Sequence, residues 1–117
     1  RKPMAIERHG TTQRYSDICA YGNTIYLVET PQTLDANVAT QTREVLAGVE
    51  KLLEQAGSDK TRLLMVTIYL RDIDDAIAVN AVWDRWVPRG TAPARICVEA
   101  KLAHHDFLLE VAVIAAR

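Results

Sequence analysis

Cysteine, glycine, proline and aromatic residues are all scarce in this sequence of 117 residues. It holds two cysteines, Cys19 and Cys97, without a CxxC pair, together with five glycines, four prolines and one phenylalanine. Two cysteines so far apart favour free thiols in a reducing compartment, and they argue against a disulfide scaffold or a cysteine zinc site. The few glycines form no phosphate-binding loop, so we expect no nucleotide cofactor.

A strong net charge and long hydrophobic runs are also missing. Fourteen Lys and Arg against fifteen Asp and Glu give a net charge of -1, too little positive field to hold a phosphate backbone. No apolar run approaches the ~20 residues needed to span a bilayer, and residues 1–8 carry no apolar signal-peptide core. We therefore expect a cytoplasmic protein that binds neither nucleic acid nor membrane.

The sequence has the composition of an ordinary globular protein. Hydrophobic residues make up 49% and charged residues 25% of the chain, values typical of a folded protein rather than a disordered one. A chain of this length suits one domain, because a second core would leave both parts too small. We predict a single domain over residues 1–117.

Hydrophobic periodicity predicts an α+β fold with the element order ββαβαββ. The predicted strands cover residues 15–20, 24–28, 62–71, 94–102 and 107–116. One helix is expected between an N-cap at Asp35 and a terminating Gly57, and a second between Asp72 or Asp74 and Pro88. The first two strands and the last two are each expected to form a hairpin. Two helices suffice to cover one face of such a sheet.

Strand parity predicts that the second face of the sheet is also covered. Residues 24–28 and 62–71 are apolar on both sides, and the economical cover is another copy of the chain, hence a homo-oligomer. If the apolar residues of the last two strands face the helices, Arg95, Cys97 and Glu110 share the opposite face.

Arg95 is the candidate binding residue on that face. Its guanidinium offers a planar fork of donors that matches a small carboxylate, although Arg95 and Glu110 could instead pair with each other or with a neighbouring chain. Cys97 lacks a well-placed His as base, so we expect it to line the pocket rather than act as a nucleophile. His104 and His105 lie in a predicted turn without matching ligands, so no metal site is predicted.

Several segments together resemble the reactive intermediate deaminase family (RidA/YjgF-like). The main ones are residues 92–102, read Ala-Pro-Ala-Arg-Ile-Cys-Val-Glu-Ala-Lys-Leu, and residues 109–115, which place Glu110 fifteen positions after Arg95. Tyr15, the Gly22-Asn23 turn, the helix from Gln41 to Gly57, residues 69–72 and residues 79–81 extend the similarity over nearly the whole chain.

The resemblance implies a fold, an assembly and an activity. Members are homotrimers with a chorismate-mutase-like α+β fold, one mixed sheet and ligand clefts between subunits. The best known members hydrolyse small 2-imino acids to 2-oxo acids and ammonia without a cofactor. By this similarity Arg95 would bind the substrate carboxylate and Glu110 would position water. Cys97, Asn80 and Tyr15 would line the cleft, with Tyr15 on the neighbouring side.

One departure from the family pattern concerns the pocket. Typical deaminating members have Ser-Gly-Gln where this chain has Val28-Glu29-Thr30, which removes a hydroxyl and adds an acid. This region and the helix around Trp83 are similar to a divergent YoaB-like branch. Two alternatives to a deaminase therefore stand: a non-catalytic trimer that binds a small carboxylate, and an endoribonuclease or translation inhibitor. The near-neutral charge argues against the second.

Overall fold

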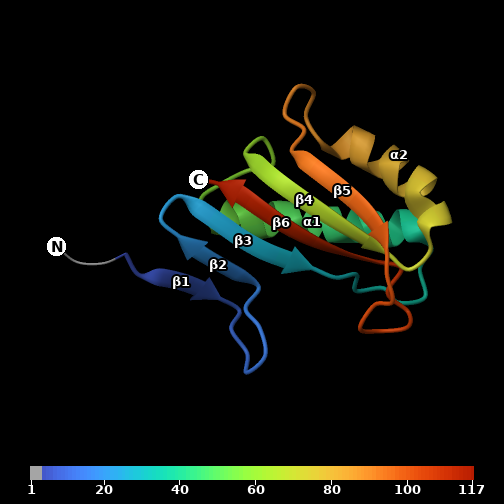
Figure 1. Ribbon diagram of the computed structural model, residues 1–117, viewed down its shortest axis with the longest axis horizontal. Coiled ribbons are helices and arrows are strands. Elements are labelled where there is room, and N and C mark those ends of the chain that lie inside the picture. Colours follow the sequence, from blue (N-terminus) through green and yellow to red (C-terminus); the bar gives the residue numbers. More distant parts are fainter. Residues whose placement is uncertain (1–3) are drawn as a thin grey trace.

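One mixed sheet and two α-helices make up the computed structural model, which describes residues 4–117. The six strands lie in the order β1-β2-β3-β6-β4-β5 across the sheet (Figure 1). A 3₁₀ turn, Ile73–Asp75, precedes the second helix. The elements are β1 (Ile6–His9), β2 (Ile18–Tyr21), β3 (Thr24–Glu29), α1 (Val38–Gln55), β4 (Leu63–Leu70), α2 (Ala76–Trp86), β5 (Ala94–Glu99) and β6 (Leu109–Ala116).

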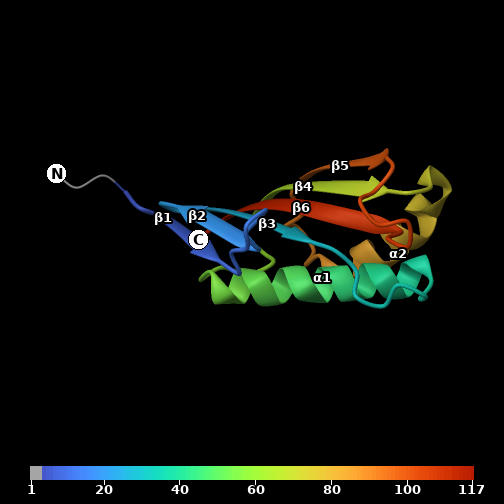
Figure 2. The same ribbon diagram turned by 90° about the horizontal axis from the view of Figure 1, so that it is seen from below.

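Both helices lie on one face of the sheet, as the sequence predicts (Figure 2). β3 and β4 are each antiparallel to β6, so they run in the same direction, and β4 pairs in parallel with β5. Two crossovers, through α1 and α2, therefore advance in the same direction across the sheet. Crossovers of one hand that advance together place their helices on the same side.

One expectation about the strands is wrong, and one strand was missed. The predicted hairpin of the last two strands does not form, because β4 lies between β5 and β6. The connection from β4 through α2 delivers β5 to the edge of the sheet, and β6 then returns to the slot between β3 and β4. The strand β1 was also not predicted, because Ile6–His9 is short, largely exposed and without apolar alternation.

The ends of the helices follow from local hydrogen bonds. α1 is capped by Asn37, whose Oδ1 accepts from the Thr40 N–H at 2.9 Å, two residues beyond the expected Asp35. It ends at Gly57 as predicted, with φ of 82° and a Ser58 N–H that donates to the Leu53 carbonyl at 2.8 Å. This is the glycine-terminated Schellman pattern, in which only Gly adopts the left-handed conformation at no cost.

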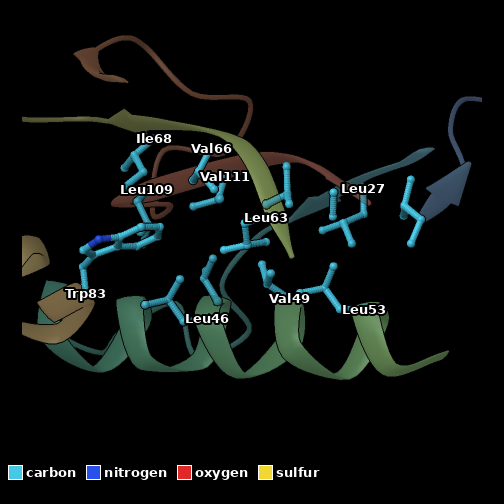
Figure 3. Close-up of a cluster of buried hydrophobic side chains, with 14 of the residues drawn as sticks. Leu27, Leu46, Val49, Leu53, Leu63, Val66, Ile68, Trp83, Leu109 and Val111 are labelled. Carbon is cyan, nitrogen blue, oxygen red and sulfur yellow. The ribbon is translucent and has the colours of Figure 1, made fainter. Parts of the chain in front are cut away.

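The core lies between the helices and the covered face of the sheet (Figure 3). Val49 and Leu53 of α1 are fully buried, and Trp83 of α2 is buried as the expected core anchor. Their partners on the sheet include Val66, Ile68, Leu109 and Val111. Burial of these large side chains stabilises the fold by about 1.5–3 kcal/mol each.

Gln41 is a fully buried polar residue that joins three segments. Its Oε1 accepts from the Leu108 N–H at 2.9 Å, and its Nε2 donates to the carbonyls of Thr33 and Asp106 at 3.2 and 3.1 Å. Gln41 thereby ties α1 to the loop before it and to the loop that enters β6.

None of the helices in residues 4–117 is long and apolar enough to cross a membrane.

Candidate functional site

Arg95 lies on the edge strand β5 and its side chain points beneath α2. It is in register with the buried Val66 of β4, which places both side chains on the helix-covered face. Its Nη2 donates to Asn80 Oδ1 at 2.9 Å, and its Cζ lies 5.1 Å from the centre of the Trp83 ring. The sheet and α2 together therefore hold this guanidinium in a defined place.

One end of the Arg95 guanidinium has no acceptor. Nη1 is buried, and among residues 4–117 it is the single buried side-chain nitrogen or oxygen without a hydrogen-bond partner. The ion pairs of the same residues join Lys60 to Glu50, His105 to Asp106 and Arg117 to Glu7, and none includes Arg95. A buried charged donor without an acceptor is destabilising, so this group is suited to an acceptor from outside these residues.

Cys97 lies two residues along β5, on the same face, and packs against the core. Burial raises the pKa of the Cys97 thiol, and the nearby Arg95 charge opposes that rise without cancelling it. The group is therefore a thiol at neutral pH, which suits a residue that lines a pocket better than a nucleophile.

The expectation that Arg95 and Cys97 face away from the helices is wrong. Ile96 and Val98, which the expectation placed in the core, lie on the open face with 50% and 39% exposure. The Arg95 guanidinium is stable beneath α2 because Asn80 accepts a hydrogen bond from it and Trp83 presents an aromatic face to it. Apolar parity alone did not reveal which set the helices cover.

Glu110 projects from the opposite, open face of the sheet. It is in register with Tyr69 of β4, and its Oε1 accepts from the Ala103 N–H at 3.3 Å. Two strand spacings and three residue steps separate it from Arg95, which corresponds to on the order of 14 Å between the Cα atoms. Within one chain the alternative of an Arg95–Glu110 pair is therefore excluded.

Tyr15 also lies apart from Arg95. It occupies the exposed loop between β1 and β2, where its carbonyl accepts from the Thr12 N–H at 2.7 Å. This loop belongs to the end of the sheet away from β5. One chain thus brings together Arg95, Asn80 and Cys97, with Trp83 as a contact that sequence reasoning assigned only to the core. The three-residue spacing of Asn80 and Trp83, which places both on the same face of one helix, is the sequence pattern that could have predicted this contact.

The open face of the sheet is largely apolar, in agreement with the two-sided strands. A hollow of about 330 Å³ lies over β3, β6 and β4, and its lining includes Cys19 and Met65. Several large apolar side chains exposed on one face of a sheet mark an interaction surface. The patch, called the open-face patch below, consists of Tyr26, Val28, Leu64, Tyr69, Ile96 and Val98, each between 37% and 51% exposed.

His104, His105 and Asp106 form a cluster on the loop before β6, with ligand atoms within 4.8 Å of one another. His104 Nδ1 already accepts from the Asp106 N–H at 3.0 Å, which leaves the hydrogen of the neutral ring on Nε2. Arg71 donates to the His105 carbonyl and brings a positive charge to the cluster. We assign no metal to it.

The single mixed sheet with two helices on one face, and an arginine held between the edge strand and the second helix, define an α+β protein of the YjgF-like class. The chain belongs to the Endoribonuclease L-PSP family, also known as YjgF/RidA, whose family model matches residues 5–117. This confirms the resemblance drawn from the sequence.

Relatives and solved structures agree with this assignment. The chain is 39% identical over 113 residues to the RutC family protein YoaB of Escherichia coli K12, covering 97% of this chain and 99% of YoaB. A RutC family protein of Haemophilus influenzae is 37% identical over 114 residues, with 96% and 98% covered. A YjgF family member from Neisseria meningitidis is 40% identical in sequence, with a TM-score of 0.93 and 99% and 98% covered.

Proposed function

We propose that this protein is a hydrolytic deaminase of small 2-imino acids, which it converts to 2-oxo acids and ammonia. The observation that carries the proposal is the buried Nη1 of Arg95 without an acceptor, in a guanidinium already held by Asn80. A carboxylate oxygen is the acceptor that completes such a group with charge-assisted hydrogen bonds. A 2-imino acid carries its carboxylate directly beside the reacting carbon, so an anchored carboxylate also fixes the site of reaction.

The proposed reaction needs positioning more than chemistry from the protein. Arg95 binds the carboxylate, and Glu110 accepts a hydrogen bond from a water molecule and orients its oxygen toward the imine carbon. The protonated imine is already electrophilic, and attack gives a carbinolamine after the water proton passes to the carboxylate. Return of that proton from Glu110 to nitrogen lets the C–N bond break as the hydroxyl oxygen forms the carbonyl of the 2-oxo acid. The hydroxyl proton leaves with the ammonia, which is released as ammonium.

Because β5 is an edge strand, backbone N–H groups beside Arg95 are also available as hydrogen-bond donors. The Ala100 N–H donates to the Leu70 carbonyl of β4 at 2.8 Å. Because backbone groups alternate in direction along a strand, the N–H groups of Arg95 and Cys97 point to the free edge of β5. A carboxylate at Nη1 of Arg95 can therefore also approach unpaired backbone donors.

We propose further that the site is a cleft between subunits of a homotrimer. The open-face patch supports this, since an apolar surface of that extent is suited to burial against a second copy. Arg95, Asn80 and Cys97 form one wall. Glu110 and Tyr15, which do not approach Arg95 within one chain, are assigned to the wall contributed by an adjoining protomer.

The test is a coupled assay in which an amino-acid oxidase generates 2-iminopropanoate in the presence of the purified protein. The wild type is expected to accelerate release of ammonia, and Arg95→Lys is expected to lose about tenfold or more, because an ammonium cannot reproduce the planar fork. Arg85→Lys, on the exposed face of α2, is the matched control and should retain activity. Unchanged hydrolysis in Arg95→Lys would reject the proposed role.

The same protein samples separate the two alternatives. A wild type that binds pyruvate through Arg95 but leaves imine decay unchanged would be a carboxylate-binding protein rather than a deaminase. The endoribonuclease alternative is supported by the name of the family, Endoribonuclease L-PSP, and opposed by the net charge of -1. RNA cleavage that survives stringent repurification and a second expression host would favour that reading.

A further inference from the structure

Trp83 is the aromatic residue that faces the Arg95 guanidinium. It lies one turn after Asn80 on α2, with its ring centre 5.1 Å from Arg95 Cζ and only 5% of its surface exposed. We propose that Trp83 is a positioning residue, which holds the guanidinium so that Nη1 is presented to a ligand carboxylate. The kinetic consequences of this inference rest on the proposed function. The claim that the Trp83 ring holds the Arg95 guanidinium in place does not depend on it.

Asn80 and Trp83 constrain the guanidinium in complementary ways. Asn80 Oδ1 accepts from Nη2, so it limits rotation at one end of the planar group. The Trp83 ring attracts the cation through its π face, and this attraction is stronger where water is excluded. Both contacts come from one rigid helix, and together they leave Nη1 as the buried end without an acceptor.

Trp83 is itself fixed by its surroundings. Figure 3 shows its ring pointing from α2 toward Leu109 and Ile68 in the core. On α2 it also packs against Trp86, with ring centres 5.5 Å apart. The Trp86 Nε1–H donates to Glu50 Oε1 of α1 at 3.1 Å. Because these contacts come from the sheet and both helices, the ring cannot move away from Arg95 without disturbing the core.

A purely structural role for Trp83 makes different predictions from a positioning role. A core anchor would affect stability alone, and any apolar side chain that filled the space would restore function. A positioning residue requires an aromatic face toward Arg95. Trp83→Phe keeps a smaller aromatic ring, whereas Trp83→Leu keeps apolar volume without one. Val49→Ala, a buried truncation on α1, is the control for lost core packing.

The first measurement is the NMR signal of the Arg95 Nε–H, assigned by its loss in Arg95→Lys. In the wild type we expect a ring-current shift and slow exchange with solvent, both retained in part by Trp83→Phe and lost in Trp83→Leu. Val49→Ala should leave the signal in place. A wild-type signal at the position of a free arginine overturns the inference, whether or not the protein hydrolyses imines.

The second measurement is kinetic, with 2-iminopropanoate as substrate and pyruvate as the binding probe. Trp83→Leu should raise KM and the pyruvate Kd about tenfold with a smaller effect on kcat, and Trp83→Phe should recover part of the loss. Equal KM values in wild type and Trp83→Leu would contradict the inference. A wild type that hydrolyses no imine, yet shows the aromatic-dependent Arg95 signal, would instead reject only the proposed function.

Discussion

Arg95 and Glu110 project from opposite faces of the same sheet, with β4 lying between their strands. A ligand of a few carbon atoms cannot contact both side chains through the sheet of one chain. If both act on one substrate, as we propose, each site combines Arg95 from one protomer with Glu110 from the next. A composite site of this kind can be tested directly by mixing two variants of the protein.

Mixing two inactive variants should restore activity. Glu110→Gln is expected to lose activity by about 10²-fold or more, the usual contribution of a positioned base. Arg95→Ala is expected to lose about as much, because the substrate is no longer anchored near the reacting water. Unfolded together and refolded at equal amounts, random trimers should regain about a quarter of wild-type activity, since each residue of a composite site is intact half the time. Imine hydrolysis of the mixture measures this.

Each variant refolded alone is the control for that mixture. Activity that stays at the level of the single variants after verified subunit exchange would place Arg95 and Glu110 in sites built by one protomer. It would contradict the composite cleft while leaving the carboxylate-binding role of Arg95 intact.

A lysine on the open-face patch should prevent assembly of the proposed oligomer. Ile96→Lys places a charge on the patch, where burial against a second copy would leave it unpaired at a cost of several kcal/mol. We expect light scattering after size-exclusion chromatography to show monomers or weakly associated species. Ile77→Lys, on the exposed surface of α2, is the matched control and should assemble normally. An intact trimer of Ile96→Lys would show that another surface holds the subunits together.

Removal of the Cys97 thiol should have little effect on the rate of imine hydrolysis. Because burial raises the pKa of Cys97, only a very small fraction of the group is thiolate near neutral pH, which does not suit a nucleophile. Cys97→Ala is therefore expected to retain most of its activity in the coupled assay, and alkylation of the wild-type thiol should be slow. A loss of about 10⁴-fold, as for a removed nucleophile, would reverse this assignment.

Glu29 should lower the stability of the chain as pH rises. Its half-buried carboxylate lies close to Gly48 of α1. Loss of hydration raises its pKa above the ordinary 4.5, and the nearby Asp17 charge adds to the rise. A hydrogen bond from the Thr30 N–H lowers the pKa but does not cancel the rise. The folded state then binds the proton more tightly than the unfolded state. Stability from this group is present below about pH 4.5 and declines as pH rises through the raised pKa.

Replacing Glu29 by Gln should therefore stabilise the protein at neutral pH, by less than about 1 kcal/mol because solvent still screens the group. The difference between variant and wild type should shrink toward acid pH in urea unfolding experiments. Glu54→Gln, an exposed acid on α1, is the control. A constant difference from pH 4 to pH 8 would contradict the raised pKa.

Gln41 should be among the most sensitive polar positions of the fold. Gln41→Leu leaves the Leu108 N–H and the Asp106 carbonyl without the partner that Gln41 supplies in a partly buried place, at an expected cost of about 3 kcal/mol of unfolding free energy. The Thr33 carbonyl loses one of its two donors and keeps the Ala36 N–H. Gln55→Leu, on the exposed side of the same helix, should change the stability little. Urea unfolding checks both, and equal midpoints would show that the Gln41 bonds contribute nothing net.

Patterns along the chain were enough to predict most of the local structure. The spacing of Val45, Val49 and Leu53 predicted α1 and its buried face, and Gly57 predicted its end, because a left-handed residue there is a local requirement. The two-sided apolar strands predicted a second covered face, and a resemblance carried by Arg95 and its neighbours identified the family.

Sheet order and the choice of face were decided only in three dimensions. The insertion of β6 between β3 and β4 depends on pairing between segments far apart in sequence, which local periodicity does not encode. By sequence the apolar Ile96 and Val98 of β5 look better suited to the covered face, and only the approach of Asn80 and Trp83 from α2 decides that Arg95 lies beneath the helix. A charged group is stable there because the tertiary structure supplies its partners, and those partners lie on a different element of the chain.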